Sequence, residues 1–186
     1  MNTPGDQRVL TGLARASIAE ALRLAVPVPP DSPILDERLG AFVTLTLRGN
    51  LRGCIGQTQS RERLRALLPA MARAAAFEDP RFPPLATAEF PIVRIEVSLL
   101  SRPVRVASPD DVVVGTHGVI VSARGRRGLL LPQVAIEWNW SREELLENVC
   151  AKAALDRDAW RHPGTRLETF TAQVYAEEEE EEEEED

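Results

Sequence analysis

Prolines divide the first half of the sequence into segments that cannot join into one regular element. Four prolines fall in residues 26–33 (VPVPPDSP), and three more fall in residues 78–85 (EDPRFPPL). Proline lacks a backbone N–H and has a restricted φ, so neither stretch can form a helix interior or an inner strand. The regular structure must therefore lie outside these two stretches.

Helical periodicity predicts one helix before the first proline stretch and another between the two. Residues 7–25 carry a mostly apolar stripe at helical spacing, and Asp6 is a candidate N-cap. Residues 60–77 are rich in leucine and alanine. Pro69 lies inside this second segment and predicts a kink or a division into two short helices.

The second half of the chain predicts two further helices. Pro132 can open a short helix, since proline is well suited to the first helical turn. Ser141 and Glu144 form a capping box ahead of an apolar run, which predicts a helix over residues 141–154.

Strand patterns form two hairpins and two single strands. Residues 41–58 predict a hairpin that turns at RGN, and residues 118–131 predict a second with a basic turn at Arg124 to Arg127. Residues 91–101 alternate between apolar and polar side chains, and residues 166–175 form a closing strand. These groups of helices and hairpins predict an α+β fold, with antiparallel sheet and flanking helices arranged as two lobes.

Negative charge is concentrated at the C-terminus. The formal net charge is −7, but residues 177–186 supply ten negative charges, so the rest of the chain has 22 basic and 19 acidic residues, or +3. Like charges repel each other and bury nothing, so we expect a domain over residues 6–175 and a disordered acidic tail over 176–186. The tail either keeps the chain soluble or engages a basic partner. Nucleic-acid binding is not expected, because no aromatic-basic motif accompanies the small positive charge.

Composition sets the expected location and the expected absence of bound groups. The sequence has no apolar run of the roughly 20 residues that a membrane span needs, and no signal-peptide pattern. We therefore expect a cytoplasmic protein without membrane association. Cys54, Cys150, His117 and His162 show no zinc-ligand spacing, so neither a metal nor a cofactor is expected, and both thiols should be free.

The hexapeptide LRGCIG, residues 51–56, is the strongest candidate for a functional site. Along a strand, Arg52 and Cys54 would share a face with their Cα atoms roughly 6.5 Å apart. A guanidinium at that range favours the thiolate form of cysteine. Gly53 and Gly56 would let a substrate or a neighbouring backbone approach closely.

A structural interpretation of Cys54 competes with this functional one. A two-residue hairpin turn would pair the strands so that Cys54 lies on the side of Val43 and Leu45, where cysteine acts as a small buried apolar residue. A bulge at Gly53 would place Cys54 on the opposite face. Both interpretations stay open from the sequence.

Three further residues are candidates for the same site. His117, at the entry to a strand, could act as a general base for Cys54, or it could simply satisfy a turn. Asp79 and Arg81 flank a proline, so their loop either presents charge beside the LRGCIG strand or is pinned by an internal ion pair. Cys150 and His162 are expected in the core and at the surface, respectively.

The order of the motifs LRGCIG, AAAFEDPRFPPL, EVSLLSRP, GTHGVIV and GLLLPQVA resembles the AMMECR domain family, over nearly all of residues 8–175. The acidic tail and the proline-rich stretch at 26–33 lie outside the family pattern, and Ala154 stands where that pattern has glycine. The resemblance implies an α+β fold of two unequal sublobes, with the LRGCIG strand near a cleft. It also implies association with a Memo-type protein and a radical SAM enzyme, as the protein A component of the AmmeMemoRadiSam system.

Carried over residue by residue, the resemblance points to a set of ligand-binding candidates. These are Arg52, Gly53, Ile55, Gly56, Asp79, Arg81 and Phe82, with Cys54 and His117 as catalytic candidates. One hypothesis is an accessory module that binds an unknown small molecule or its partner proteins. The alternative is a thiol-dependent enzyme with Cys54 as nucleophile. A third hypothesis is RNA or nucleotide binding through Arg52, Arg124, Arg126 and Arg127. It has less support because the basic residues form no long stripe.

Overall fold

The computed structural model describes residues 4–177, which divide into two compact units. The first unit comprises residues 4–99 and 173–177, and the second comprises residues 100–172. Each unit has its own four-stranded sheet. The expected α+β class with antiparallel pairing and flanking helices is therefore confirmed.

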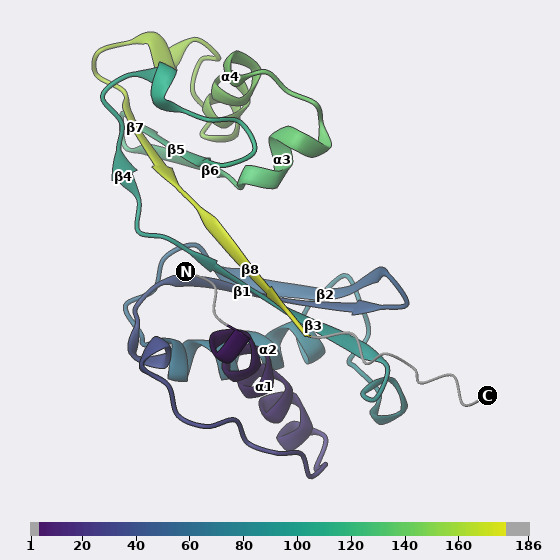
Figure 1. Ribbon diagram of the computed structural model, residues 1–186. Coiled ribbons are helices and arrows are strands. Elements are labelled where there is room, and N and C mark those ends of the chain that lie inside the picture. Colours follow the sequence, from purple (N-terminus) through teal and green to yellow (C-terminus); the bar gives the residue numbers. More distant parts are fainter. Residues whose placement is uncertain (1–3, 178–186) are drawn as a thin grey trace, which may run out of the picture. The chain divides into compact units, whose positions relative to one another are not determined.

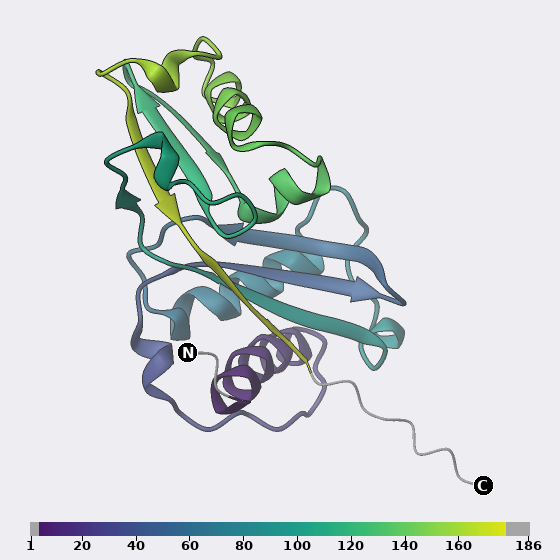
Figure 2. The ribbon, with the colours of Figure 1, turned by 45° about the horizontal axis from the view of Figure 1, so that its top comes forward.

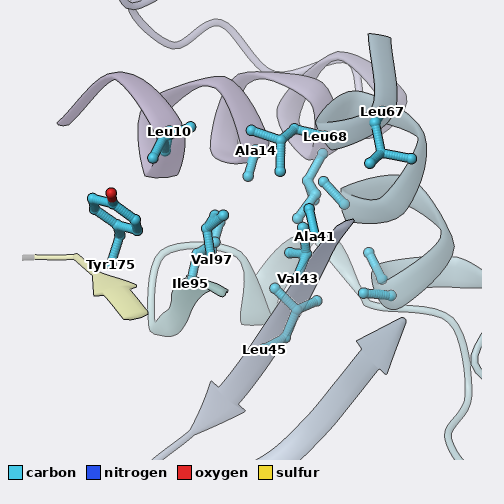
Figure 3. Close-up of a cluster of buried hydrophobic side chains, with 14 of the residues drawn as sticks. Leu10, Ala14, Ala41, Val43, Leu45, Leu67, Leu68, Ile95, Val97 and Tyr175 are labelled. Carbon is cyan, nitrogen blue, oxygen red and sulfur yellow. The ribbon is translucent and has the colours of Figure 1, made fainter. Parts of the chain in front are cut away.

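In the first unit, two helices cover one face of a sheet whose strand order is β2-β1-β3-β8 (Figure 1). Leu10 and Ala14 from one helix and Leu68 from the other are fully buried against Val43 and other strand residues (Figure 3). The elements are α1 (Pro4–Ala21), β1 (Gly40–Leu47), β2 (Asn50–Gln57), α2 (Leu64–Phe77), β3 (Val93–Leu100) and β8 (Ala172–Ala176), with short 3-10 turns at Pro33–Asp36 and Thr87–Glu89.

The second unit is built on a sheet of order β4-β7-β5-β6. Its core contains Leu145, Leu146 and Val149 of a helix together with Val119 and Val121 of an inner strand. Figure 2 shows this helix, in green, beside the strands of the unit. The elements are β4 (Val104–Arg105), β5 (Gly118–Ala123), β6 (Arg126–Leu130), α3 (Pro132–Glu137), α4 (Arg142–Lys152) and β7 (Arg166–Phe170), with 3-10 turns at Pro109–Asp111 and Ala159–Arg161.

The capping box at α4 is present as expected, and the other end of that helix explains Ala154. The Ser141 hydroxyl accepts from the Glu144 N–H, while the Glu144 carboxylate accepts from the Ser141 N–H. After α4, Ala154 adopts a φ of 57°, and the Leu155 N–H donates back to the Cys150 carbonyl. This is the left-handed helix ending that glycine usually provides, so the turn is kept although the glycine is not.

The sequence-based description of the first two helices is wrong at several points. The first helix ends at Ala21 rather than near residue 25, because Arg23 turns to a φ of 60° and the Leu24 N–H donates to the Ala19 carbonyl. The second helix begins at Leu64 rather than Ser60, and Pro69 lies inside a single helix without dividing it.

The predicted closing strand is divided. Residues 166–170 form β7 in the sheet of the second unit, and residues 172–176 form β8 in the sheet of the first. Period-two alternation does not report which sheet a residue joins, so the pattern appeared continuous. At the end of β8, the Glu177 N–H donates to Ile95 and its carboxylate pairs with Arg15. The rest of the predicted acidic tail, residues 178–186, lies outside the described residues.

Candidate functional site

The register of the first hairpin decides which way Cys54 faces. Near the turn Thr46 pairs with Leu51, but beyond it Leu45 pairs with Gly53 and Thr44 with Cys54. Arg52 is the extra residue of a β-bulge, and the bulge shifts every later residue of β2 to the other face.

Cys54 therefore lies on the Thr44 side of the sheet, away from the buried Val43 and Leu45. Its Sγ is 3.3 Å from the Thr44 Oγ1, in a hydrogen bond in which either atom can donate. Cys54 is half-buried and Cys150 is fully buried, and both thiols are free. The interpretation of Cys54 as a core cysteine beside Val43 and Leu45 is thus wrong, because it assumed a hairpin without a bulge.

Arg52 holds the loop of residues 78–85 in place. Its Nε and Nη2 each lie 2.9 Å from the Glu89 carboxylate, in a bidentate pair. Its Nη1 donates to the Pro83 carbonyl at 2.9 Å, and Nη2 also donates to the Pro84 carbonyl at 3.3 Å. The side chain is only 11% exposed. All three guanidinium nitrogens are thus committed to protein atoms other than the Cys54 thiol, contrary to the expected Arg52–thiolate pairing.

Glu89 is a residue that the sequence did not single out. Its carboxylate accepts from Arg52 and from the Ala86 N–H, and these hydrogen bonds, the Arg52 pair first, lower the pKa of Glu89. The signal available in the sequence was indirect, since a buried arginine requires a carboxylate or carbonyl partner but does not reveal which one.

Asp79 ties the loop to the strand beneath it. Its side chain is 2% exposed, and its carboxylate accepts from the Cys54 N–H at 2.9 Å and the Arg81 N–H at 3.0 Å. It also accepts from Nε and Nη2 of Arg81, at 3.0 and 2.8 Å. The Arg81 side chain and then the Cys54 backbone N–H hold the pKa of Asp79 well below its usual range.

Arg81 is the guanidinium that reaches the Cys54 peptide unit. Its Nη2 also donates to the Cys54 carbonyl at 3.3 Å, and its Cζ lies 5.5 Å from the centre of the Phe82 ring. The hydrogen bonds to the Asp79 carboxylate raise the pKa of Arg81. The side chain is 55% exposed, and within residues 4–177 its Nη1 donates to no protein atom. The loop therefore contains the predicted ion pair and also presents charge beside the LRGCIG strand.

The two glycines of the hexapeptide accommodate the protein's own atoms. A Cβ on Gly53 would lie 2.1 Å from the Ala75 carbonyl oxygen of α2, and a Cβ on Gly56 would lie 2.4 Å from the Phe42 ring. Ile55 is half-buried and packs on the core of the first unit. The close approaches expected at these glycines are thus made by a helix and an aromatic ring.

His117 belongs to the second unit, whereas Cys54 belongs to the first. The imidazole Nδ1 of His117 accepts a hydrogen bond from the Val113 N–H at 3.0 Å, and the backbone N–H of His117 donates to the Val113 carbonyl. His117 therefore closes a local turn, with Nδ1 already used as an acceptor. His162 is exposed, with its Nε2 3.9 Å from an Asp158 carboxylate oxygen.

Neither a metal-binding cluster nor a membrane-spanning helix occurs within residues 4–177. Among residues 4–177, no cluster of three or more His, Cys, Asp or Glu side chains is arranged to hold a metal ion. Within the same range, none of the helices has the length and apolar character needed to cross a bilayer.

The molecule is thus an α+β protein of two units, in which a bulged hairpin and the loop of residues 78–85 bring the half-buried Cys54 into hydrogen-bond contact with Asp79 and Arg81. The AMMECR1 family model matches residues 11–175, and the chain belongs to this family. A protein from Methanothermobacter thermautotrophicus is 44% identical over 93% of this chain and 95% of its own length. Protein PF1979 from Pyrococcus furiosus is 39% identical over 91% of this chain and 87% of its own length. The crystal structure of uncharacterized protein PH0010 from Pyrococcus horikoshii is similar at 36% identity with a TM-score of 0.75, covering 93% of this chain and 92% of that one.

Proposed function

We propose that this protein is a cytoplasmic accessory module that binds a small anionic ligand or an acidic group of a partner at the surface of Cys54 and Arg81. The observation that carries the proposal is the state of Arg81. Two of its guanidinium nitrogens are held by the buried Asp79, while Nη1 has no protein acceptor in the described part of the chain and the side chain is half-exposed. A guanidinium fixed in this way loses little conformational freedom when it binds an oxyanion.

The surroundings of the thiol favour binding over turnover. The Cys54 thiol forms its side-chain hydrogen bond with the Thr44 hydroxyl, which is not a base at neutral pH. Asp79 accepts four hydrogen bonds, and its lowered pKa makes it a weak proton acceptor. His117 is engaged in its own turn.

The family resemblance supports a finer version, in which the partners are a Memo-type protein and a radical SAM enzyme of the AmmeMemoRadiSam system. The test is co-purification of the tagged chain with each of these proteins at low salt, using wild type, Arg81→Gln and Arg63→Gln. Arg63 is a matched control, because it is 54% exposed, pairs with Asp36 and belongs to the same unit.

Retention of a partner by wild type and Arg63→Gln, with loss in Arg81→Gln, is the expected result. Circular dichroism must show that Arg81→Gln is folded, since the substitution removes the main partner of the buried Asp79. Arg81→Lys provides a second variant that keeps the charge near Asp79. Equal retention by all four proteins would refute the proposed site, and retention by none would refute these partners.

The alternative function is a thiol-dependent enzyme with Cys54 as nucleophile. Half-exposure of Cys54 and the nearby Arg81 charge favour it, because both are features of reactive cysteines. Its test is the loss of a measured activity in Cys54→Ser but not in Cys150→Ser. Cys54→Ser leaves the backbone N–H that binds Asp79 in place, so an active Cys54→Ser protein would exclude the nucleophile.

A further inference from the structure

Two adjoining cavities lie in the second unit, apart from the residues of the Cys54 site. One has a volume of about 430 Å³ and the other about 250 Å³, and they meet at His162 and Thr165, which line both. The larger cavity falls within the range of volumes that hold small molecules. All lining residues belong to residues 100–172, so these cavities are a property of the second unit alone.

The charged residues that line these cavities are mainly arginines. Arg124 and Arg126 line the larger cavity, and Arg105 and Arg161 line the smaller one. Asp156 is the one carboxylate residue among the described lining residues of either cavity. Exposed arginines around a concave surface attract oxyanions and raise their local concentration.

The arginines of the cavities differ in their protein partners. Arg161 pairs with Glu143, and Arg126 donates to the Ala154 carbonyl, which leaves its positive charge uncompensated by a carboxylate. The side chains of Arg124 and Arg105 donate to no protein acceptor within residues 4–177. By contrast, the neighbouring Arg166 pairs with Glu168. Three cavity arginines thus have no carboxylate partner within residues 4–177.

Fixed groups shape the wall between the two cavities. The Thr165 hydroxyl donates to the Ala159 carbonyl at 2.6 Å, so its position is set by the 3-10 turn. The Trp160 ring lines the smaller cavity, with the Arg161 guanidinium 4.3 Å above its centre. The buried Trp160 Nε1 has no acceptor in the described part of the chain. An aromatic wall beside guanidinium groups suits an organic anion with a compact apolar part.

We propose that these adjoining cavities form a second binding site for a small organic anion carrying phosphate or carboxylate groups, with Arg124 as its main counterion. Arg126 and Arg105 add positive charge on the two sides of His162. Arginine binds both kinds of oxyanion through paired N–H donors, so the shared chemistry is that of a multiply charged oxyanion.

Arg127 provides a matched control for Arg124. Both are exposed and lie at the same hairpin tip. Ala123 pairs with Arg126 and lines the larger cavity, whereas Arg127 pairs with Ser122 on the other face of the ribbon and lines neither cavity. Changing either residue to glutamine removes one positive charge, but only Arg124→Gln removes it from the proposed site.

The experiment is a titration of the full chain with inorganic pyrophosphate and, separately, with citrate, followed by calorimetry and by NMR. Arg124→Gln should weaken binding of the preferred probe about tenfold, the loss expected for one charge-assisted hydrogen bond. Arg127→Gln should change it less than twofold. The amide signals of Gly164 and Thr165 and the indole signal of Trp160 should shift, and these shifts should weaken in Arg124→Gln. Shifts of Thr44 and Cys54 would report separately on the site proposed in the first unit.

Preference for pyrophosphate would identify a phosphate ligand, and preference for citrate a carboxylate ligand. Equal weakening by Arg124→Gln and Arg127→Gln would overturn the proposal, because it would indicate unspecific attraction to a basic turn. Failure of both probes to shift the signals of the second unit would also overturn it. Neither result bears on the Cys54 site, whose residues belong to the first unit.

Discussion

Replacing Arg52 with methionine should destabilise the first unit by about 3 kcal/mol. Removal of one member of a buried ion pair costs about 3–5 kcal/mol, because the other charge is left without compensation. Here the lower end applies, since Glu89 is 25% exposed and keeps its hydrogen bond from the Ala86 N–H. The Pro83 and Pro84 carbonyls belong to exposed residues and can turn to water, so they add little.

The measurement is urea unfolding followed by far-ultraviolet circular dichroism. Tryptophan fluorescence is unsuitable for this purpose, because Trp138, Trp140 and Trp160 all lie in the second unit. Arg52→Lys serves as a control that keeps the charge but cannot form the bidentate pair and both carbonyl bonds at once, so its loss should be intermediate.

A double-mutant cycle identifies the mechanism. If Glu89 is the partner left uncompensated, Arg52→Met combined with Glu89→Gln should cost clearly less than the sum of the two single changes. Additive losses, or a loss below about 1 kcal/mol in Arg52→Met, would refute the assignment of Arg52 as the residue that holds the loop.

Three further predictions concern other parts of the molecule. Ala154→Gly should stabilise the second unit by about 0.5–1 kcal/mol, because relief of a left-handed alanine outweighs the entropy that glycine adds to the unfolded chain; an unchanged or lower thermal midpoint by tryptophan fluorescence would contradict this. The folded-state pKa of Asp79 is lowered, so the contribution of Asp79 to stability is fully present above about pH 4 and is lost as the pH falls towards that lower pKa. Asp79→Asn should therefore flatten the acid side of a plot of unfolding free energy against pH, and an unaltered plot would contradict this role of Asp79. Cys54 should be alkylated in the folded protein, whereas Cys150, fully buried with a pKa raised by burial, should react only on unfolding; mass spectrometry that finds Cys150 labelled first would exclude this order.

Much of the candidate site was visible as a set of residues before its geometry was known. The LRGCIG and DPRFPPL segments do lie together, joined by the hydrogen bond from the Cys54 N–H to Asp79. The role of Arg52 could not be assigned from spacing, because Arg81 and not Arg52 contacts the Cys54 peptide unit. Arg52 turns to Glu89, 37 residues away, and Arg81 reaches Cys54, 27 residues away.

The sequence by itself determined the features that depend on neighbouring residues. Proline positions, the Ser141 capping box, the hairpin turns and the apolar stripes predicted the elements and the α+β class, since each is set by contacts within a few residues. Only the tertiary structure decided the bulge at Arg52, the division of the last strand at Thr171 and the face on which Cys54 lies. These depend on strand register and on buried pairs between distant segments, and a one-residue shift in register reverses every side chain without altering the local pattern.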